Sequence, residues 1–158
     1  MGSDSQSERM DEREVEELYP AVLMLEATAV VHTPPYDAVA IARLREANEQ
    51  LLAARDAPTA ARADDLFHLR LTERCGNPEL IAVLRPMREQ LMAYERRYFA
   101  TQERRDRSAA QHGRIVDALE AGDHARAGEL IRENFTTALP GPNAGPDACG
   151  DGPAGATT

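Results

Sequence analysis

Short breaks rich in proline and glycine divide the middle of this chain into about six segments, each long enough to form a helix. Within the segments, apolar residues recur three and four positions apart, as in Leu80, Leu84, Met87 and Leu91. This is the spacing of one face of an α-helix. β-Branched runs are scarce, and the good helix formers Ala, Leu, Glu and Arg are frequent. The sequence therefore predicts an all-α fold, and the short connections favour an antiparallel bundle.

The expected helices cover residues 11–32, 36–55, 59–73, 78–103, 106–120 and 123–139. Pro20 predicts a kink in the first helix or its division into two pieces, and Pro86 predicts a bend in the fourth. Residues 1–10 are polar, and residues 140–158 are rich in Gly, Pro, Ala and Asp. Neither end offers enough apolar surface to offset the entropy cost of ordering, so both are expected to be disordered around one domain at 11–139.

The formal net charge of −9 argues against direct DNA binding by this chain, because such domains normally present a basic face to the phosphates. No apolar run approaches the ~18 residues of a membrane span, and no leader pattern begins the chain. The two cysteines, Cys75 and Cys149, lie far apart and do not indicate a disulfide framework. We expect a cytoplasmic protein with no membrane contact.

Four polar residues interrupt the apolar faces of three expected helices. Asp64 and His68 are four positions apart, so on a helix they project from the same side and could hold one ion together. His112 shares a face with apolar residues three, four and seven positions further on, and Asn134 points inward in the same manner. The pattern indicates a central polar cavity. The alternative for each residue is a hydrogen-bonded position in an ordinary core.

The same region carries motifs of a known family. Asp64-x-x-Phe67-His68, followed eight residues later by Gly76-Asn77-Pro78, resembles the FCD domain, the effector-binding half of the FadR subfamily of GntR transcription regulators. Three further segments are similar to the family in order and spacing: 17–26, 111–123 and 127–135. The resemblance covers about residues 11–139 and implies six or seven antiparallel helices around a central cavity.

The resemblance also implies a divalent ion, often zinc or nickel, held by one Asp and three His. By position the ligands would be Asp64, His68, His112 and Asn134. Asn134 replaces the last His, and an amide oxygen is a weaker, neutral ligand for such ions. The Arg usual in the family's first helix is Val22 here, which weakens the case for a carboxylate effector held by that Arg. The winged-helix DNA-binding domain that precedes the family's bundle has no counterpart in this sequence.

Three functions are compatible with these features. The leading one is a sensor domain that binds a small molecule, such as a carboxylate, in transcription control. The alternative is a metal-dependent enzyme that hydrolyses, isomerises, dehydrates or cyclises a small metabolite in the same cavity. The third is a dimerisation domain that pairs through residues such as Leu80, Tyr94 and Tyr98, since family members usually form homodimers.

Two further residues are candidates for ligand binding. Arg88 follows the Ile81 and Leu84 side of its helix and would reach the cavity to bind an anion, with a surface ion pair as the alternative. Tyr94 extends the apolar stripe of the same helix, for which packing in the core or at an interface is the alternative.

Overall fold

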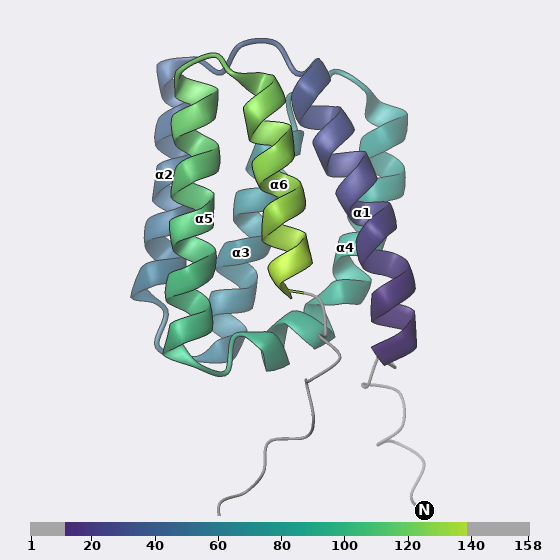
Figure 1. Cartoon of the computed structure of the whole chain (residues 1–158), viewed down its shortest axis with the longest axis vertical. Helices are drawn as coiled ribbons and strands as arrows, with labels where there is room; N and C mark the ends of the chain where they lie inside the picture. Colours follow the sequence, from purple (N-terminus) through teal and green to yellow (C-terminus); the bar gives the residue numbers. More distant parts are fainter. Residues whose placement is uncertain (1–11, 139–158) are drawn as a thin grey trace, which may run out of the picture.

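A computed structural model describes residues 12–138 and contains six α-helices in that range (Figure 1). They are α1 (Glu12–His32), α2 (Ala38–Ala53), α3 (Ala57–Thr72), α4 (Pro78–Tyr98), α5 (Gln102–Glu120) and α6 (His124–Ala138). The predicted all-α bundle is confirmed. The two ends expected to be disordered, 1–10 and 140–158, lie outside the described residues.

The helices pack in a closed ring. Around the bundle the order of neighbours is α1, α6, α5, α2, α3 and α4, and α4 returns to α1. Figure 1 shows α2 and α5 on one side, α1 and α4 on the other, and α6 between them at the front with α3 behind. A contact between α1 and α3 crosses the ring. Side chains that point inward from α1, α3, α4, α5 and α6 therefore meet at one centre.

Polar caps fix the helix ends. The side chains of Asp37, Asp56 and Asn77 accept hydrogen bonds from backbone N–H groups three residues further on, at the starts of α2, α3 and α4. Each such cap contributes about 1 kcal/mol. Gly76 and Gly122 adopt φ of 70° and 77° after α3 and α5, a conformation that glycine adopts without steric cost.

One expected boundary is wrong. The fourth helix was expected to reach residue 103, but α4 ends at Tyr98 and α5 begins at Gln102 rather than near residue 106. The side chain of Thr101 accepts a hydrogen bond from the backbone N–H of Arg104 and starts α5 there. A local cap therefore overrides the apolar stripe, which continues through Phe99.

The expected interruption at Pro20 does not divide α1, which runs continuously from Glu12 to His32. Pro20 is exposed, so solvent can bind the backbone carbonyl that loses its partner at this position.

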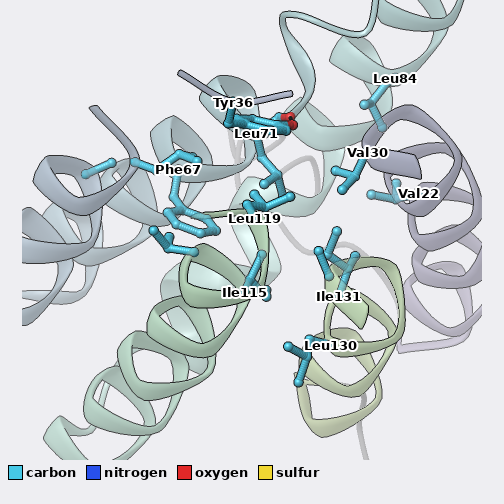
Figure 2. Packing of buried hydrophobic residues seen from close by; sticks show 14 of the residues in the cluster. Val22, Val30, Tyr36, Phe67, Leu71, Leu84, Ile115, Leu119, Leu130 and Ile131 are labelled. Carbon is cyan, nitrogen blue, oxygen red and sulfur yellow. Dashed lines mark hydrogen bonds between the residues drawn. The ribbon is translucent and has the colours of Figure 1, made fainter. Parts of the chain in front are cut away.

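The apolar core fills the bundle between the helices. Figure 2 shows Phe67 and Leu71 of α3 facing Ile115 and Leu119 of α5, with side chains of α1 and α6 completing the cluster. Within residues 12–138, no helix is both long and apolar enough to cross a membrane.

Of the residues considered for dimerisation, Tyr98 is buried within the protomer, and Leu80 and Tyr94 are partly buried against its core. They therefore contribute to the fold of a single chain.

Candidate metal and ligand site

Asp64, His68 and His112 meet at the centre of the bundle. Asp64 and His68 lie one turn apart on α3, and His112 faces them from the middle of α5; each is at most 5% exposed. The Nε2 atoms of His112 and His68 lie 3.3 Å and 3.7 Å from the two carboxylate oxygens of Asp64. One candidate ligand atom from each residue lies within 4.8 Å of the others. The structure thus brings together three of the four residues that the sequence singled out as ligands.

Aromatic packing holds the two imidazoles in place. The ring of Phe67 stacks on that of His112, with centroids 3.8 Å apart and an angle of 2° between the planes. The His68 ring meets the His112 ring edge-on at 5.2 Å. Phe67 is fully buried. The family motif Phe67-His68 therefore has a physical purpose, because consecutive residues of α3 contact the same α5 imidazole.

A buried carboxylate on α1 sets the orientation of His68. Glu26 is fully buried, and its Oε2 accepts a hydrogen bond of 2.8 Å from Nδ1 of His68. A proton at Nδ1 leaves the lone pair of the ring at Nε2, on the side of Asp64, and a carboxylate at Nδ1 is the usual support of a metal-binding histidine. Burial alone would lower the pKa of His68, but Glu26, assisted by Asp64, outweighs it, and the pKa is raised.

His112 differs from His68 because neither of its ring nitrogens has a hydrogen-bond partner in the described part of the chain. Burial, together with the charges of His68 and Arg88, lowers the pKa of His112 well below its ordinary value, so the ring is neutral. A neutral imidazole with a free lone pair, facing a carboxylate in a dry centre, is suited to bind a cation. The donor set of one carboxylate and two imidazoles therefore fits zinc, nickel or a similar ion.

Asn134 of α6 lines the same centre. Its Nδ2 donates a hydrogen bond of 2.8 Å to Oε1 of Gln111 on α5. An amide that donates through nitrogen has only its carbonyl oxygen to offer to a cation, and this oxygen carries no formal charge. Asn134 can therefore contribute to the site but cannot replace the imidazole of the family pattern in full.

Arg88 enters the centre from α4 and is only 4% exposed. Its guanidinium donates to Asp65 at 2.9 Å, to Glu26 at 3.1 Å, to Asp64 at 3.4 Å and to Glu95 at 3.5 Å. The surface ion pair considered from the sequence is thus replaced by a buried network. The four carboxylates outnumber this one guanidinium, which leaves the centre favourable to a further cation.

Tyr94 contacts aromatic neighbours. Its ring meets Tyr19 edge-on at 5.7 Å, and the guanidinium of Arg97 lies 5.9 Å from its centroid. It does not belong to the residues that line the central cavity, whereas Tyr19 and Tyr98 do.

The central cavity has a volume of about 10 Å³, which is enough for one water-sized group. Its lining includes Asp64, His68 and Asn134, and also Glu95, which the sequence analysis did not select. Burial raises the pKa of Glu95 to about 8, although Arg88 opposes this shift. Burial also raises the pKa of Asp64, against the effects of His68 and Arg88.

A signal for the missed residues was present in the sequence. Glu26 follows Val22 by four positions, and Glu95 lies between Leu91 and Tyr98, so both occupy inward positions of apolar stripes. Acidic residues normally face solvent, so a sequence pattern does not by itself place Glu26 and Glu95 on the inward faces of their helices.

Comparison with known proteins agrees with the geometry. The model of the FCD domain matches residues 17–137. No curated protein matches the sequence.

Two solved structures share the fold. One is a transcriptional regulator of the GntR family from Pseudomonas syringae pv. tomato str. DC3000, with 17% identity and a TM-score of 0.70. The other, assigned as a transcriptional regulator GntR, is from Rhodococcus sp. RHA1, with 20% identity and a TM-score of 0.72. Each similarity covers 83% of this chain, but only 56% and 64% of the respective regulator.

Proposed function

Because the chain belongs to the FCD domain family, we propose that it is the sensor domain of a transcription regulator. It binds a small molecule beside a divalent cation, such as zinc or nickel, held by Asp64, His68 and His112 with a contribution from Asn134. The family match and the fold shared with GntR-family regulators support the regulatory role. The convergence of the three ligand-capable side chains supports the cation.

The observation that carries the proposal is the state of His112. Its two ring nitrogens are fully buried without a partner in the described residues, and one of them lies 3.3 Å from Asp64. A buried polar atom without a partner costs about 1–3 kcal/mol. A cation between Asp64 and the imidazoles would satisfy the nitrogen that faces Asp64. An ordinary apolar residue at position 112 would avoid the cost altogether.

The surrounding residues have separate tasks in this proposal. Glu26 keeps the Nε2 lone pair of His68 available, and Phe67 holds the plane of His112. The bound cation would supply a Lewis-acid anchor for an oxygen of the effector. Val22, at the position of the family's arginine, is fully buried in the apolar cluster. The effector is therefore held by the cation rather than by a guanidinium from α1.

The test begins with the cation. The purified chain is stripped with a chelator, reloaded with Zn²⁺ or Ni²⁺, and analysed for bound metal. We expect one ion per chain in the wild type and none in His68→Ala. His32→Ala is the matched control, since His32 is exposed at the end of α1 and should leave the metal content unchanged. A full metal complement in His68→Ala would contradict the ligand set.

The same preparation separates sensing from catalysis. Acetate, succinate and citrate are tested as probes for an increase in melting temperature with and without the cation. A sensor predicts stabilisation that requires the cation, with the probe recovered unchanged. Stabilisation that is the same without the cation would contradict the proposed mode of binding. Conversion of a probe would support the enzyme instead.

We further propose that the domain acts as a cytoplasmic homodimer, as is usual for regulators of this family. Exposed apolar side chains on α1 and α4, namely Met24 and Val83, support a contact with a second copy. Sedimentation of the purified chain tests this, and a monomer at micromolar concentration would contradict it.

A further inference from the structure

Glu95 is the least satisfied carboxylate of the buried centre. It is 3% exposed, and its Oε1 lies 3.5 Å from Arg88, the longest of the four contacts of that guanidinium. Its Oε2 has no hydrogen-bond partner among the described residues. An isolated carboxylate oxygen in a dry centre is costly unless a cation or a hydrogen-bond donor reaches it. The described part of the chain therefore supplies no hydrogen-bond partner for Oε2 of Glu95.

The missing partner has a defined place. Glu95 lines the same cavity of about 10 Å³ as Asp64, His68 and Asn134. A cavity of this size holds one water molecule or one ligand atom of similar size. A group that fills it therefore lies next to Asp64, His68 and Asn134 and also next to Glu95.

The residues of the cavity also show an imbalance of charge. Asp64 is the one charged group of the candidate ligand set, since His68 and His112 would coordinate as neutral rings and Asn134 offers a neutral amide. A divalent cation there would retain one uncompensated positive charge. We propose that Glu95 supplies the second negative charge, by accepting a hydrogen bond from the water or ligand group beside the cation. This inference rests on the proposed metal site.

Arg88 does not remove the need for this role. Its short contacts, at 2.9 Å and 3.1 Å, go to Asp65 and Glu26, and only its longer ones reach Asp64 and Glu95. Asp65 provides a matched control, because it also pairs with Arg88 but lines the groove between α3 and α4 and not the central cavity. Removing the charge of Asp65 thus perturbs the same arginine without changing the wall of the cavity.

The experiment measures the affinity of the full chain for Mn²⁺ and Zn²⁺ by competition with a chromophoric chelator. Glu95→Gln keeps the shape and an oxygen that can accept from Arg88, but removes the charge. We expect it to weaken binding by about 10–100-fold, the usual effect of a supporting residue at a metal site. Asp65→Asn should weaken binding by less than about fivefold.

Two further measurements separate this role from a merely structural one. The circular dichroism and melting temperature of metal-free Glu95→Gln should match or exceed those of the wild type, because a poorly satisfied buried acid has been replaced by a neutral amide of the same shape. The absorption spectrum of the Co²⁺-loaded protein should change in Glu95→Gln and remain as in the wild type in Asp65→Asn. Glu95→Ala is the second variant, with the same expected loss of affinity, should Glu95→Gln fold poorly.

The outcomes are distinct. Wild-type affinity in Glu95→Gln, or equal losses in Glu95→Gln and Asp65→Asn, would overturn the role of Glu95. If His112→Ala abolishes binding at the same time, the proposed metal site still stands. A wild-type chain that binds neither ion would overturn both.

Discussion

The two sides of Asp64 differ in how their polar atoms are satisfied. On the α4 side, the nitrogens of Arg88 are distributed over four carboxylates. On the α5 side, His112 is equally buried but neither of its nitrogens has a partner in the described residues. Paired groups of this kind stabilise a fold, whereas unsatisfied buried polar atoms cost stability and persist where function requires them. The difference indicates that the contacts of Arg88 are mainly structural, whereas the unpaired atoms, on His112 and at Oε2 of Glu95, are the positions where we propose that a ligand acts.

The largest expected effect comes from removing Arg88. Arg88→Met leaves several buried carboxylates without a counter-charge and should lower the free energy of unfolding by about 3–5 kcal/mol. Urea denaturation of the metal-free chain measures this. The neighbouring Arg85→Met is the control, since Arg85 is exposed and should change stability by less than about 0.5 kcal/mol. Equal effects would break the distinction between the two sides.

Replacing His112 by an apolar residue should have the opposite effect on the free energy of unfolding. His112→Leu removes two unsatisfied nitrogens, so the metal-free variant should be as stable as the wild type or more stable by about 1 kcal/mol. It should also lose all uptake of Zn²⁺ in elemental analysis. A destabilisation as large as that of Arg88→Met would show that His112 is an ordinary core residue.

Glu26 links the Arg88 network to His68, one of the candidate metal ligands. It accepts a hydrogen bond from His68 at 2.8 Å and from Arg88 at 3.1 Å. Glu26→Gln should therefore weaken metal binding by about tenfold, through loss of the support of His68. Chelator competition measures the affinity. An unchanged affinity would mean that the orientation of His68 does not depend on Glu26.

The smallest expected effect is a pH dependence. The folded state lowers the pKa of His112 below its ordinary value of 6.5, so the unfolded chain takes up a proton first as the pH falls. Protonation of His112 in the unfolded chain therefore lowers the stability of the fold below pH 6.5 relative to neutral pH, by up to about 1.4 kcal/mol per pH unit. Urea denaturation of the metal-free wild type and His112→Leu between pH 7 and about pH 5 isolates this contribution. Parallel pH profiles would contradict it.

Much of the fold was predictable because its signals are local. Breaks at Gly76 and Gly122, together with apolar spacing, place most of the helices correctly. The boundary near Thr101 was missed because the apolar stripe of α4 continues through Phe99, whereas the start of α5 depends on a single capping hydroxyl. Local signals could not reveal the ring of neighbours, which depends on packing between distant segments.

The three ligand-capable residues of the centre were predictable, but their surroundings were not. The spacing of Asp64 and His68 implies one face of one helix, and the family motif adds His112. Glu26 and Glu95 were missed, because an acidic residue is buried only when partners from other helices accompany it. Those partners are visible only once α1, α3 and α4 are placed side by side.

The most direct test of the central claim is diffraction from crystals of this chain loaded with Zn²⁺ or Mn²⁺, with data collected at the anomalous edge or wavelength of the ion. We expect one strong anomalous peak in contact with Asp64, His68 and His112, with a nitrogen of His112 as a direct ligand. A fully loaded crystal whose peak lies elsewhere, or in which both nitrogens of His112 are hydrogen-bonded to protein or water, would contradict it.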